Sequence, residues 1–465
     1  MRLHPVNWII GYGKSLNVGF LTLTWMSQLK KLVRLGRSLG ASDVCVIVSD
    51  TVHRMVRFAN NEVTVAKSIT SSYTEVYACV NGRKAVNSTT ETGEITLERL
   101  VRNTVKMAKS SMQSETYAPL PSGPFRYDEK LLRHVGQQPG PEDLAEYVSQ
   151  AIQGGLDSGA SRVAGTLSQI YEKRRLATSA GVEVSSENSG LEISVRAFAD
   201  SDSTGHFVSV ASDDRGFKPY EAGLRAGEIA LMAREPVDGE AGVYEALIGP
   251  MTFAHLVEQV GVFSSAFYVD AGVSFLTGQV GSDVASRRLT ILDDPTIVGS
   301  YGARAFDDEG VSTRANLIIS GGKLAGYLHN SGTARKFGTT TTANAGLIVP
   351  HPFNLYVQPG DKSLDQLISS IDRGLWVTND WYLRYQNYRA GEFSTIPRDG
   401  LFLIKRGSVE KAVRGLRISD NILNILRGVR DMGREGYWVK WWEMEIPTYA
   451  PAVTVDRLNF TRSAI

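Results

Sequence analysis

The chain has 465 residues, with 50 Lys and Arg against 49 Asp and Glu, so its formal net charge is only +1. That length predicts two or more domains with ample core. The charge balance excludes a global electrostatic field that would favour nucleic acid or an acidic membrane as partner. The sequence contains no run of roughly 18 apolar residues, so no membrane-spanning helix is expected. These features are typical of a cytoplasmic protein.

The two cysteines, Cys45 and Cys79, lie on expected strands. The sequence leaves open whether they meet in space. Because both have apolar neighbours, buried free thiols are favoured over a disulfide framework.

The first 25 residues show no clean helical or strand period, and they lack the compact apolar region and cleavage site of a signal peptide. A regular helical pattern starts only at Met26. We therefore expect residues 1–25 to be a leader that arises from a mis-assigned start, with Met26 as the true first residue. The alternative is an N-terminal arm.

Residues 26–236 are expected to form an N-terminal α+β domain built from two units, about 26–118 and 140–236. Each unit reads as a helix, then strands, then a helix, which predicts an antiparallel sheet with helices to one side. The polar stretch Pro236–Gly242 marks the domain boundary. Expected strands are 44–48, 55–66, 71–80, 162–170, 174–178, 182–186, 191–198 and 206–212, with a turn signal at 60–61.

The C-terminal domain, residues 243–465, opens with the segment Met251–Tyr268, whose apolar residues recur every three or four positions. That spacing predicts a mostly buried helix. Many short strands follow, which favours a mostly-β curled or barrel-like sheet around the helix. They are expected at 288–292, 315–319, 325–329, 354–358, 374–377, 400–405 and 450–455, with further helices at 364–371 and 420–429.

Five short sequences follow the expected helix in a recognisable order. Gly278–Gly281 reads GQVG, and LTILDDP, FDDEG, KLAGYLHN and VPHPFNLYVQPG come after it. This order and spacing resemble the C-terminal half of the TldD/TldE (PmbA) family, whose heterodimers are peptidases. The resemblance covers the chain from about Met26 to the end and is most specific over Gly278–Tyr327. It implies the same two-domain architecture.

In TldD members of that family a helix at this distance before GQVG carries His-Glu-x-x-x-His, where two imidazoles hold zinc and the glutamate is the general base. Laid on this chain without gaps, the pattern falls on Val257, Glu258 and Val262. Valine offers no lone pair to a metal. The family's third ligand, a cysteine, should fall around Tyr437–Val439, which reads Tyr-Trp-Val. The resemblance therefore implies a TldE-like (PmbA-like) chain without a metal or other cofactor, with zinc in its partner.

Two residues of the expected helix remain as chemical candidates. Glu258 could act as a general base, but it lacks a metal-bound water to activate, so a hydrogen bond or a subunit contact is the favoured role. His255 precedes Val257 by two residues, which on a helix turns it about 200° away, so it cannot simply replace a ligand there. We identify no catalytic residue from the sequence.

Three further clusters have a functional and a structural interpretation. The acidic runs Asp293–Asp294 and Asp307–Glu309 could hold a cation, but each ends in Pro or Gly, which favours turns capped by Asp. The aromatic cluster Tyr437–Trp442 could stack bases. Because no basic patch accompanies it, buried packing or a protein interface is favoured.

The sequence thus predicts an interaction subunit that pairs with a TldD-like metal-bearing chain and helps to enclose a chamber for unfolded or small peptides. An extended peptide could bind there by adding a strand to an exposed sheet edge. The alternative is an independent hydrolase, or a peptide-binding homo-oligomer, with an unrecognised site.

Overall fold

A computed structural model describes residues 18–136 and 139–463. The helices are α1 (Val18–Ser38), α2 (Glu94–Ser110), α3 (Glu129–Leu132), α4 (Pro141–Asp157), α5 (Pro219–Met232), α6 (Pro250–Phe263), α7 (Ala266–Asp270), α8 (Ser331–Lys336), α9 (Leu364–Ser369) and α10 (Ile422–Arg427). The strands are β1 (Asp43–Ala59), β2 (Glu62–Val80), β3 (Arg83–Thr89), β4 (Arg133–His134), β5 (Arg162–Thr178), β6 (Glu183–Phe198), β7 (Thr204–Ala211), β8 (Val237–Asp238), β9 (Gly242–Ile248), β10 (Ile291–Asp293), β11 (Asn316–Ser320), β12 (Lys323–Leu324), β13 (Leu355–Val357), β14 (Arg373–Val377), β15 (Trp381–Asn387), β16 (Glu392–Ile396), β17 (Leu401–Lys405), β18 (Ser408–Arg414), β19 (Leu416–Asn421), β20 (Val429–Trp441) and β21 (Met444–Arg462).

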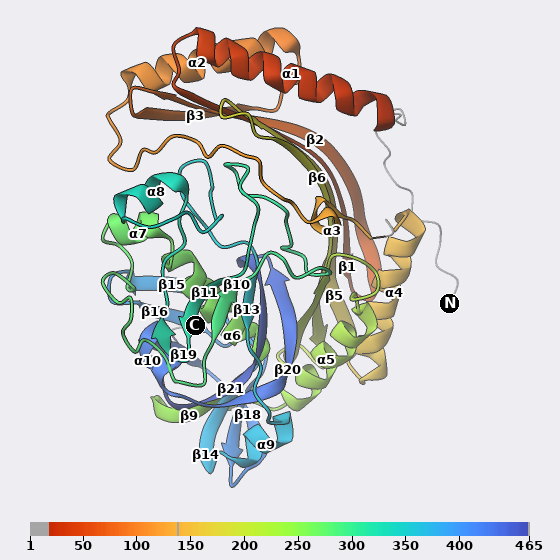
Figure 1. Cartoon of the computed structure of the whole chain (residues 1–465). Coiled ribbons are helices and arrows are strands. Elements are labelled where there is room, and N and C mark those ends of the chain that lie inside the picture. Colours follow the sequence, from red (N-terminus) through yellow and green to blue (C-terminus); the bar gives the residue numbers. More distant parts are fainter. Residues whose placement is uncertain (1–17, 137–138, 464–465) are drawn as a thin grey trace.

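The N-terminal sheet has the order β3-β2-β1-β5-β6, with β4 and β7 also on β6, and only the short β4 pairs in parallel. It curves around one side of the C-terminal domain, with α1, α2, α4 and α5 on its outer face (Figure 1). The predicted α+β class, with a helix-flanked antiparallel sheet, is confirmed. Both cysteines lie on its strands as buried free thiols, as expected.

The strands of this sheet are much longer than predicted. β1 covers the expected strand 44–48 and the first part of the expected strand 55–66, and β2 begins with the rest of that second strand. The two observed strands are separated by the predicted turn, where Asn60 and Asn61 both have positive φ. Likewise the pieces predicted within 162–178 and 182–198 are each one strand. The polar residues that interrupt the apolar pattern have partners on neighbouring strands. Arg175 of β5, for example, forms an ion pair with Asp50 of β1 at 2.6 Å.

The first helix starts earlier than the pattern indicated. α1 begins at Val18, eight residues before Met26, and Trp25 packs against the core between α1, α2 and the sheet. The helix therefore includes residues 18–25 of the expected leader, while the assignment of Met26 as the true first residue stays a prediction. Residues 1–17 lie outside the described residues.

The C-terminal sheet is mixed and curls around α6, as predicted for this domain. β21 lies at its centre and pairs with β9, β13, β19 and β20. α6 begins after Gly249 with Pro250 at its first position, where the missing N–H costs no hydrogen bond. Almost all of its side chains are buried, which explains why apolar residues occur on every face.

Several predictions of elements in this domain were wrong. The expected helix 251–268 is two helices, because Ser264 and Ser265 turn their hydroxyls onto the carbonyls of Gly261 and Pro350. Residues 325–329 are not a strand. β15, β16, β18, β19 and β20 were missed. Register shifts interrupt the pairing of β15 with β16 and of β20 with β21, and such irregularities break the two-residue alternation on which strand prediction depends.

Candidate functional site

The positions onto which the family resemblance places the metal motif lie on α6, inside the C-terminal domain. Val257 is fully buried and Val262 partly buried, and both are purely apolar. In the part of the chain that the structure describes, no three or more His, Cys, Asp or Glu side chains gather where they could hold a metal. The residues present do not fit a zinc ion.

The residues at the expected third ligand position are also packing residues. Tyr437–Val439 lies on β20, where Val439 is fully buried and the Tyr437 ring meets Phe207 edge-on at 5.3 Å. These contacts tie β20 to β7 of the N-terminal sheet. The segment therefore joins the two domains.

Glu258 is engaged with the backbone. Its Oε1 accepts N–H hydrogen bonds from Glu445 at 2.7 Å and from Ile446 at 2.8 Å, at the start of β21. The side chain is only 4% exposed. Burial raises the pKa of this carboxyl to about 6, although the two N–H groups act in the other direction. Glu258 thus fastens α6 to β21 in the folded chain.

His255 lies on the same helix and makes a different contact. Its Nδ1 is 3.0 Å from Oδ2 of Asp380, which also accepts the hydroxyl hydrogen of Thr395. Burial by itself would lower the pKa of this imidazole, but the Asp380 carboxylate outweighs it and the pKa is raised. Asp380, fully buried and 125 residues away in the sequence, was not found by sequence analysis.

An open pocket of about 290 Å³ lies beside this histidine. Its lining comes from three elements: His255 and Gln259 from α6, Leu383, Arg384 and Tyr385 from β15, and Trp442 and Glu443 from the turn between β20 and β21. Sequence analysis did not predict this pocket, because the strand and the turn that complete it were not predicted as neighbours of α6.

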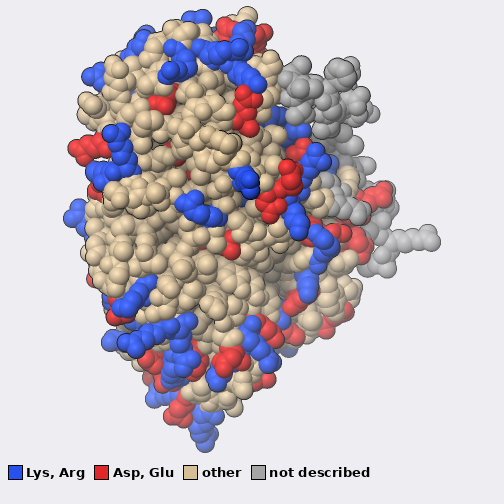
Figure 2. Space-filling view, in the orientation of Figure 1, with Lys and Arg blue, Asp and Glu red and all other residues tan. Residues whose placement is uncertain are grey.

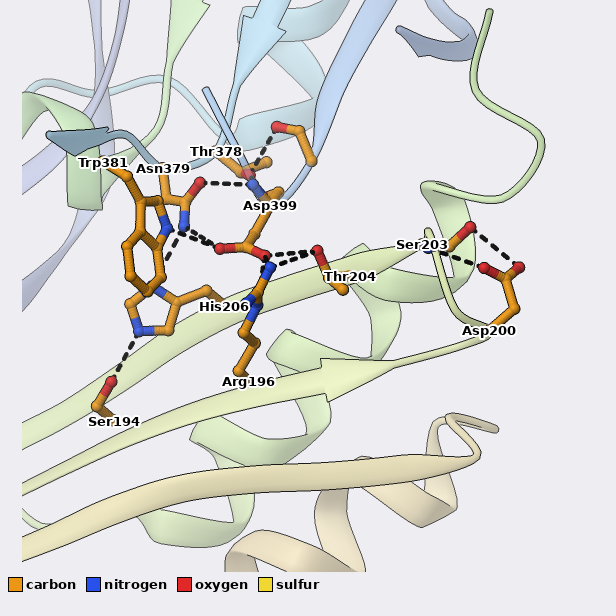
Figure 3. Close-up of polar contacts among 11 residues, drawn as sticks. Ser194, Arg196, Asp200, Ser203, Thr204, His206, Thr378, Asn379, Trp381 and Asp399 are labelled. Carbon is orange, nitrogen blue, oxygen red and sulfur yellow. Dashed lines mark hydrogen bonds and ion pairs between the residues drawn. The ribbon is translucent and has the colours of Figure 1, made fainter. Parts of the chain in front are cut away.

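A second buried polar cluster joins the domains around Asp399 (Figure 3). This carboxylate is fully buried and accepts hydrogen bonds from Arg196 at 2.7 Å, Asn379 at 3.0 Å and the Trp381 indole at 2.7 Å, and also from Thr204. Arg196 and Thr204 belong to the N-terminal sheet. The cluster therefore fastens β6 and β7 to the C-terminal domain.

The same cluster holds a histidine beside a serine, an arrangement that can activate a nucleophile. His206 Nε2 lies 2.8 Å from Ser194 Oγ, and Nδ1 lies 3.2 Å from Asn379 Nδ2. Asn379 is oriented by Asp399 on both sides, since its Oδ1 accepts the Asp399 N–H while its Nδ2 donates to the carboxylate. Nδ1 of His206 must then accept a hydrogen bond from the Asn379 amide, which assigns the ring N–H to Nε2.

With that tautomer His206 donates to Ser194 and cannot take its proton. Burial lowers the pKa of His206 to about 4, so the ring is neutral at physiological pH. We conclude that the Ser194–His206 pair is structural.

Each acidic run contains a turn cap, the structural interpretation favoured above: Asp294 Oδ1 accepts the N–H of Thr296, and Asp307 Oδ1 accepts those of Glu309 and Val311. Asp293 instead accepts the N–H groups of Phe353 and Asn354, which are 60 and 61 residues away in the sequence. The aromatic cluster divides in two. Trp441 is buried against His206 with ring centroids 4.9 Å apart, whereas Trp442 is 59% exposed at the pocket. On the face shown in Figure 2, side chains of both charges are interspersed.

Comparison with known proteins agrees with the architecture. A family model described as the PmbA/TldA metallopeptidase C-terminal domain matches residues 241–462. Models of the central domain and of domain 1 match residues 136–234 and 46–108. The chain belongs to the PmbA/TldD family.

Curated PmbA/TldD relatives match part of the chain. A protein named Metalloprotease from Methanothermobacter thermautotrophicus is 30% identical over 264 residues, 54% of this chain and 55% of that protein. A Metalloprotease TldD homolog from Haemophilus influenzae is 25% identical over 337 residues, 65% of this chain and 68% of that protein. The matched stretch thus spans little more than half of the first relative.

Solved structures of two proteins share the PmbA/TldD fold over nearly the whole chain. One is a candidate modulator of a DNA gyrase from Thermotoga maritima, with a TM-score of 0.80, 22% identity, and coverage of 94% of this chain and 100% of that one. The other is TldE from Thermococcus kodakarensis, with a TM-score of 0.80, 20% identity, and coverage of 93% and 100%. No helix in the described ranges is long and apolar enough to cross a membrane.

Proposed function

We propose that this chain is the TldE-like, non-catalytic subunit of a heteromeric metallopeptidase that acts on unfolded or small peptides, with zinc held by a TldD-like partner. The observation that carries the proposal is the pair Val257 and Val262 at the ligand positions of a PmbA/TldD helix. A peptidase of this kind needs a metal to lower the pKa of its nucleophilic water, and this chain offers that metal no imidazole there.

Glu258 supports the same conclusion. A general base must reach the water that it deprotonates. Here one carboxylate oxygen accepts two backbone N–H groups of β21, and the side chain is buried. Retention of the glutamate is explained by its structural role in joining α6 to the central strand.

The partner is expected at the free edge of β2. β3 pairs only with residues 74–80 of β2, so the backbone of residues 62–73 has no neighbouring strand on that side within the described chain. Val65, Ile69 and Tyr73 lie exposed along this half. An unpaired strand edge with apolar side chains is a template for strand addition. We propose that a strand of the TldD-like chain adds here, in the cytoplasm.

Purification of this chain with a TldD-like relative that carries the His-Glu-x-x-x-His motif tests the proposal. We expect the two chains to co-elute, zinc to follow the partner at one per complex, and peptide cleavage to require both chains. Cleavage by this chain alone, or zinc in this chain at one per molecule after mild chelation, would contradict it.

The docking edge is tested by Ile69→Lys, which places a charge on the free half of β2. Ile95→Lys, at an 84% exposed position of α2, is the matched control. We expect the first variant to weaken co-elution by at least tenfold in affinity, a loss of about 1.4 kcal/mol, and the control to leave it unchanged. Equal behaviour of the two variants would place the interface elsewhere.

A further inference from the structure

Two residues of opposite charge line the pocket beside α6, and they do not form an ion pair with each other. Arg384 and Glu443 both line it, yet within the described residues they form no ion pair. The Arg384 guanidinium donates a hydrogen bond to the carbonyl of its own neighbour, Leu383. Glu443 uses Oε2 to accept the N–H of Tyr382. One cationic and one anionic group are thus available at the same cavity.

Three polar atoms in and behind this wall also lack a hydrogen-bond partner among the described residues. They are Oε1 of Glu443, the hydroxyl of Tyr385 and Oδ1 of Asp380, and all three are buried. Asp380 is the carboxylate that holds His255, and its side chain is 1% exposed. Buried polar groups in native proteins are nearly always satisfied, so an unsatisfied group requires an explanation. Two of the three are carboxylate oxygens, which need donors.

We propose that this pocket binds a small zwitterion, namely an amino acid or a dipeptide with free amino and carboxyl ends. The ammonium group donates to Glu443, and the carboxylate pairs with Arg384, a geometry that suits the guanidinium fork. The aromatic ring of Trp442 and the side chain of Leu383 receive the apolar side chain. A volume of about 290 Å³ is at the small end of ligand pockets and matches a ligand of this size.

The contacts of His255 do not support a catalytic role for the pocket. His255, with Asp380 behind it, has the form of a general base, but such a base needs a nucleophile to activate. The hydrogen bond that His255 makes in the described chain is to Asp380, and no hydroxyl or thiol contacts it. The pocket also offers a single imidazole, and no group of three metal-binding side chains occurs in the described part. Binding is therefore the activity that this pocket supports.

The unmodified full chain, without any partner, is titrated by calorimetry with leucyl-phenylalanine, its N-acetyl form, its C-terminal amide, and free phenylalanine. We expect a zwitterion to bind and each blocked form to bind at least about tenfold more weakly, because each loses one charge-assisted hydrogen bond. The amino acid and the dipeptide distinguish a free metabolite from a peptide end. No binding of either at millimolar concentration, or equal binding of the blocked forms, would overturn the proposal.

Two variants assign the ends of the ligand. With Glu443→Gln the preference for the free amino group over the N-acetyl form should vanish, and with Arg384→Gln the preference for the carboxylate over the amide should vanish. Glu392→Gln and Arg389→Gln make the same changes on exposed residues outside the pocket and should behave as the unaltered chain. Unchanged preferences in both pocket variants would place the ligand elsewhere.

If a variant fails to fold, the blocked ligands on the unaltered chain decide. Because the chain is tested alone, failure of this proposal leaves that of the heteromeric peptidase standing.

Discussion

Two of the buried histidines, His206 and His255, have carboxylates close by, yet their pKa values shift in opposite directions. His255 touches Asp380 directly and its pKa is raised. His206 is separated from Asp399 by Asn379, and burial lowers its pKa to about 4. A carboxylate raises the pKa of an imidazole most when it contacts the ring, whereas Asp399 is already paired with Arg196.

The hydrogen bonding around the two buried carboxylates also differs. The Asp399 carboxylate is fully paired with Arg196, Asn379 and the Trp381 indole, and this network joins two domains. Around Asp380 and Glu443 buried oxygens remain unpartnered, and a pocket opens beside them. A satisfied buried network stabilises a fold, while an unsatisfied one beside a cavity indicates a ligand. The difference assigns stability to the first region and binding to the second.

The largest expected effect comes from breaking the domain junction. Asp399→Asn removes the charge that Arg196 faces, with Asp399 fully buried and the Arg196 side chain 25% exposed. Loss of one partner of a buried pair costs about 3–5 kcal/mol, and we expect a drop of that size in the free energy of unfolding measured with denaturant. The control is Asp238→Asn, whose ion pair with Arg414 is solvent-exposed and should contribute less than about 1 kcal/mol. Equal losses in the two variants would show that the buried pair at the junction contributes no more to the free energy of unfolding than an exposed pair does.

The next effect is a dependence of stability on pH that originates from His206. Its pKa is about 4 in the folded chain and about 6.5 when unfolded, so between these values the unfolded state binds more protons. Stability from this group is complete above pH 6.5 and is lost as the pH falls towards 4, by up to about 3 kcal/mol. Denaturant unfolding at several pH values measures this. His206→Gln should flatten the curve in that window, and an unchanged curve would contradict the argument.

The contrast between the two histidines is sharpened by Asp380→Asn. Without the carboxylate, we expect burial to outweigh the weaker effect of the Glu258 and Glu443 carboxyls, so the pKa of His255 should change from raised to lowered. An NMR titration of the imidazole protons follows this directly. We expect a stability loss of about 1–3 kcal/mol at neutral pH, from the lost charged hydrogen bond. A pKa that stays raised would mean that Glu258 or Glu443 holds the charge instead.

The sequence predicted the class of the fold and the buried helix, because those depend on local periodicity. It could not predict the strands that carry polar residues on a covered face, such as Asp50 and Arg175, since their partners lie more than 100 residues away. His255 and Glu258 could be identified because they lie on the predicted helix α6. Asp380 and Glu443 could not, because only the tertiary fold brings them close to that helix. The family resemblance indicated where a metal would be sought, and the two valines there were visible in the sequence alone.

The smallest expected effect is that of Glu258→Gln, and it separates a structural glutamate from a catalytic one. Glutamine keeps a carbonyl oxygen that can accept the N–H groups of Glu445 and Ile446, so α6 should stay joined to β21. Burial raises the pKa of this carboxyl to about 6, which means that at neutral pH the folded state holds an unfavourable buried charge. Its removal should therefore leave stability unchanged or raise it by up to about 1 kcal/mol.

The same variant, mixed with a zinc-bearing TldD-like chain at fixed ratio, should keep peptide turnover within a few-fold. Replacing the partner's own motif glutamate should cost on the order of 10²–10⁴, the usual range for a lost general base. If Glu258→Gln abolished turnover while the two chains still co-eluted, this carboxylate would contribute to the chemistry. Its two backbone contacts would then describe only the resting chain, and the non-catalytic assignment would fail.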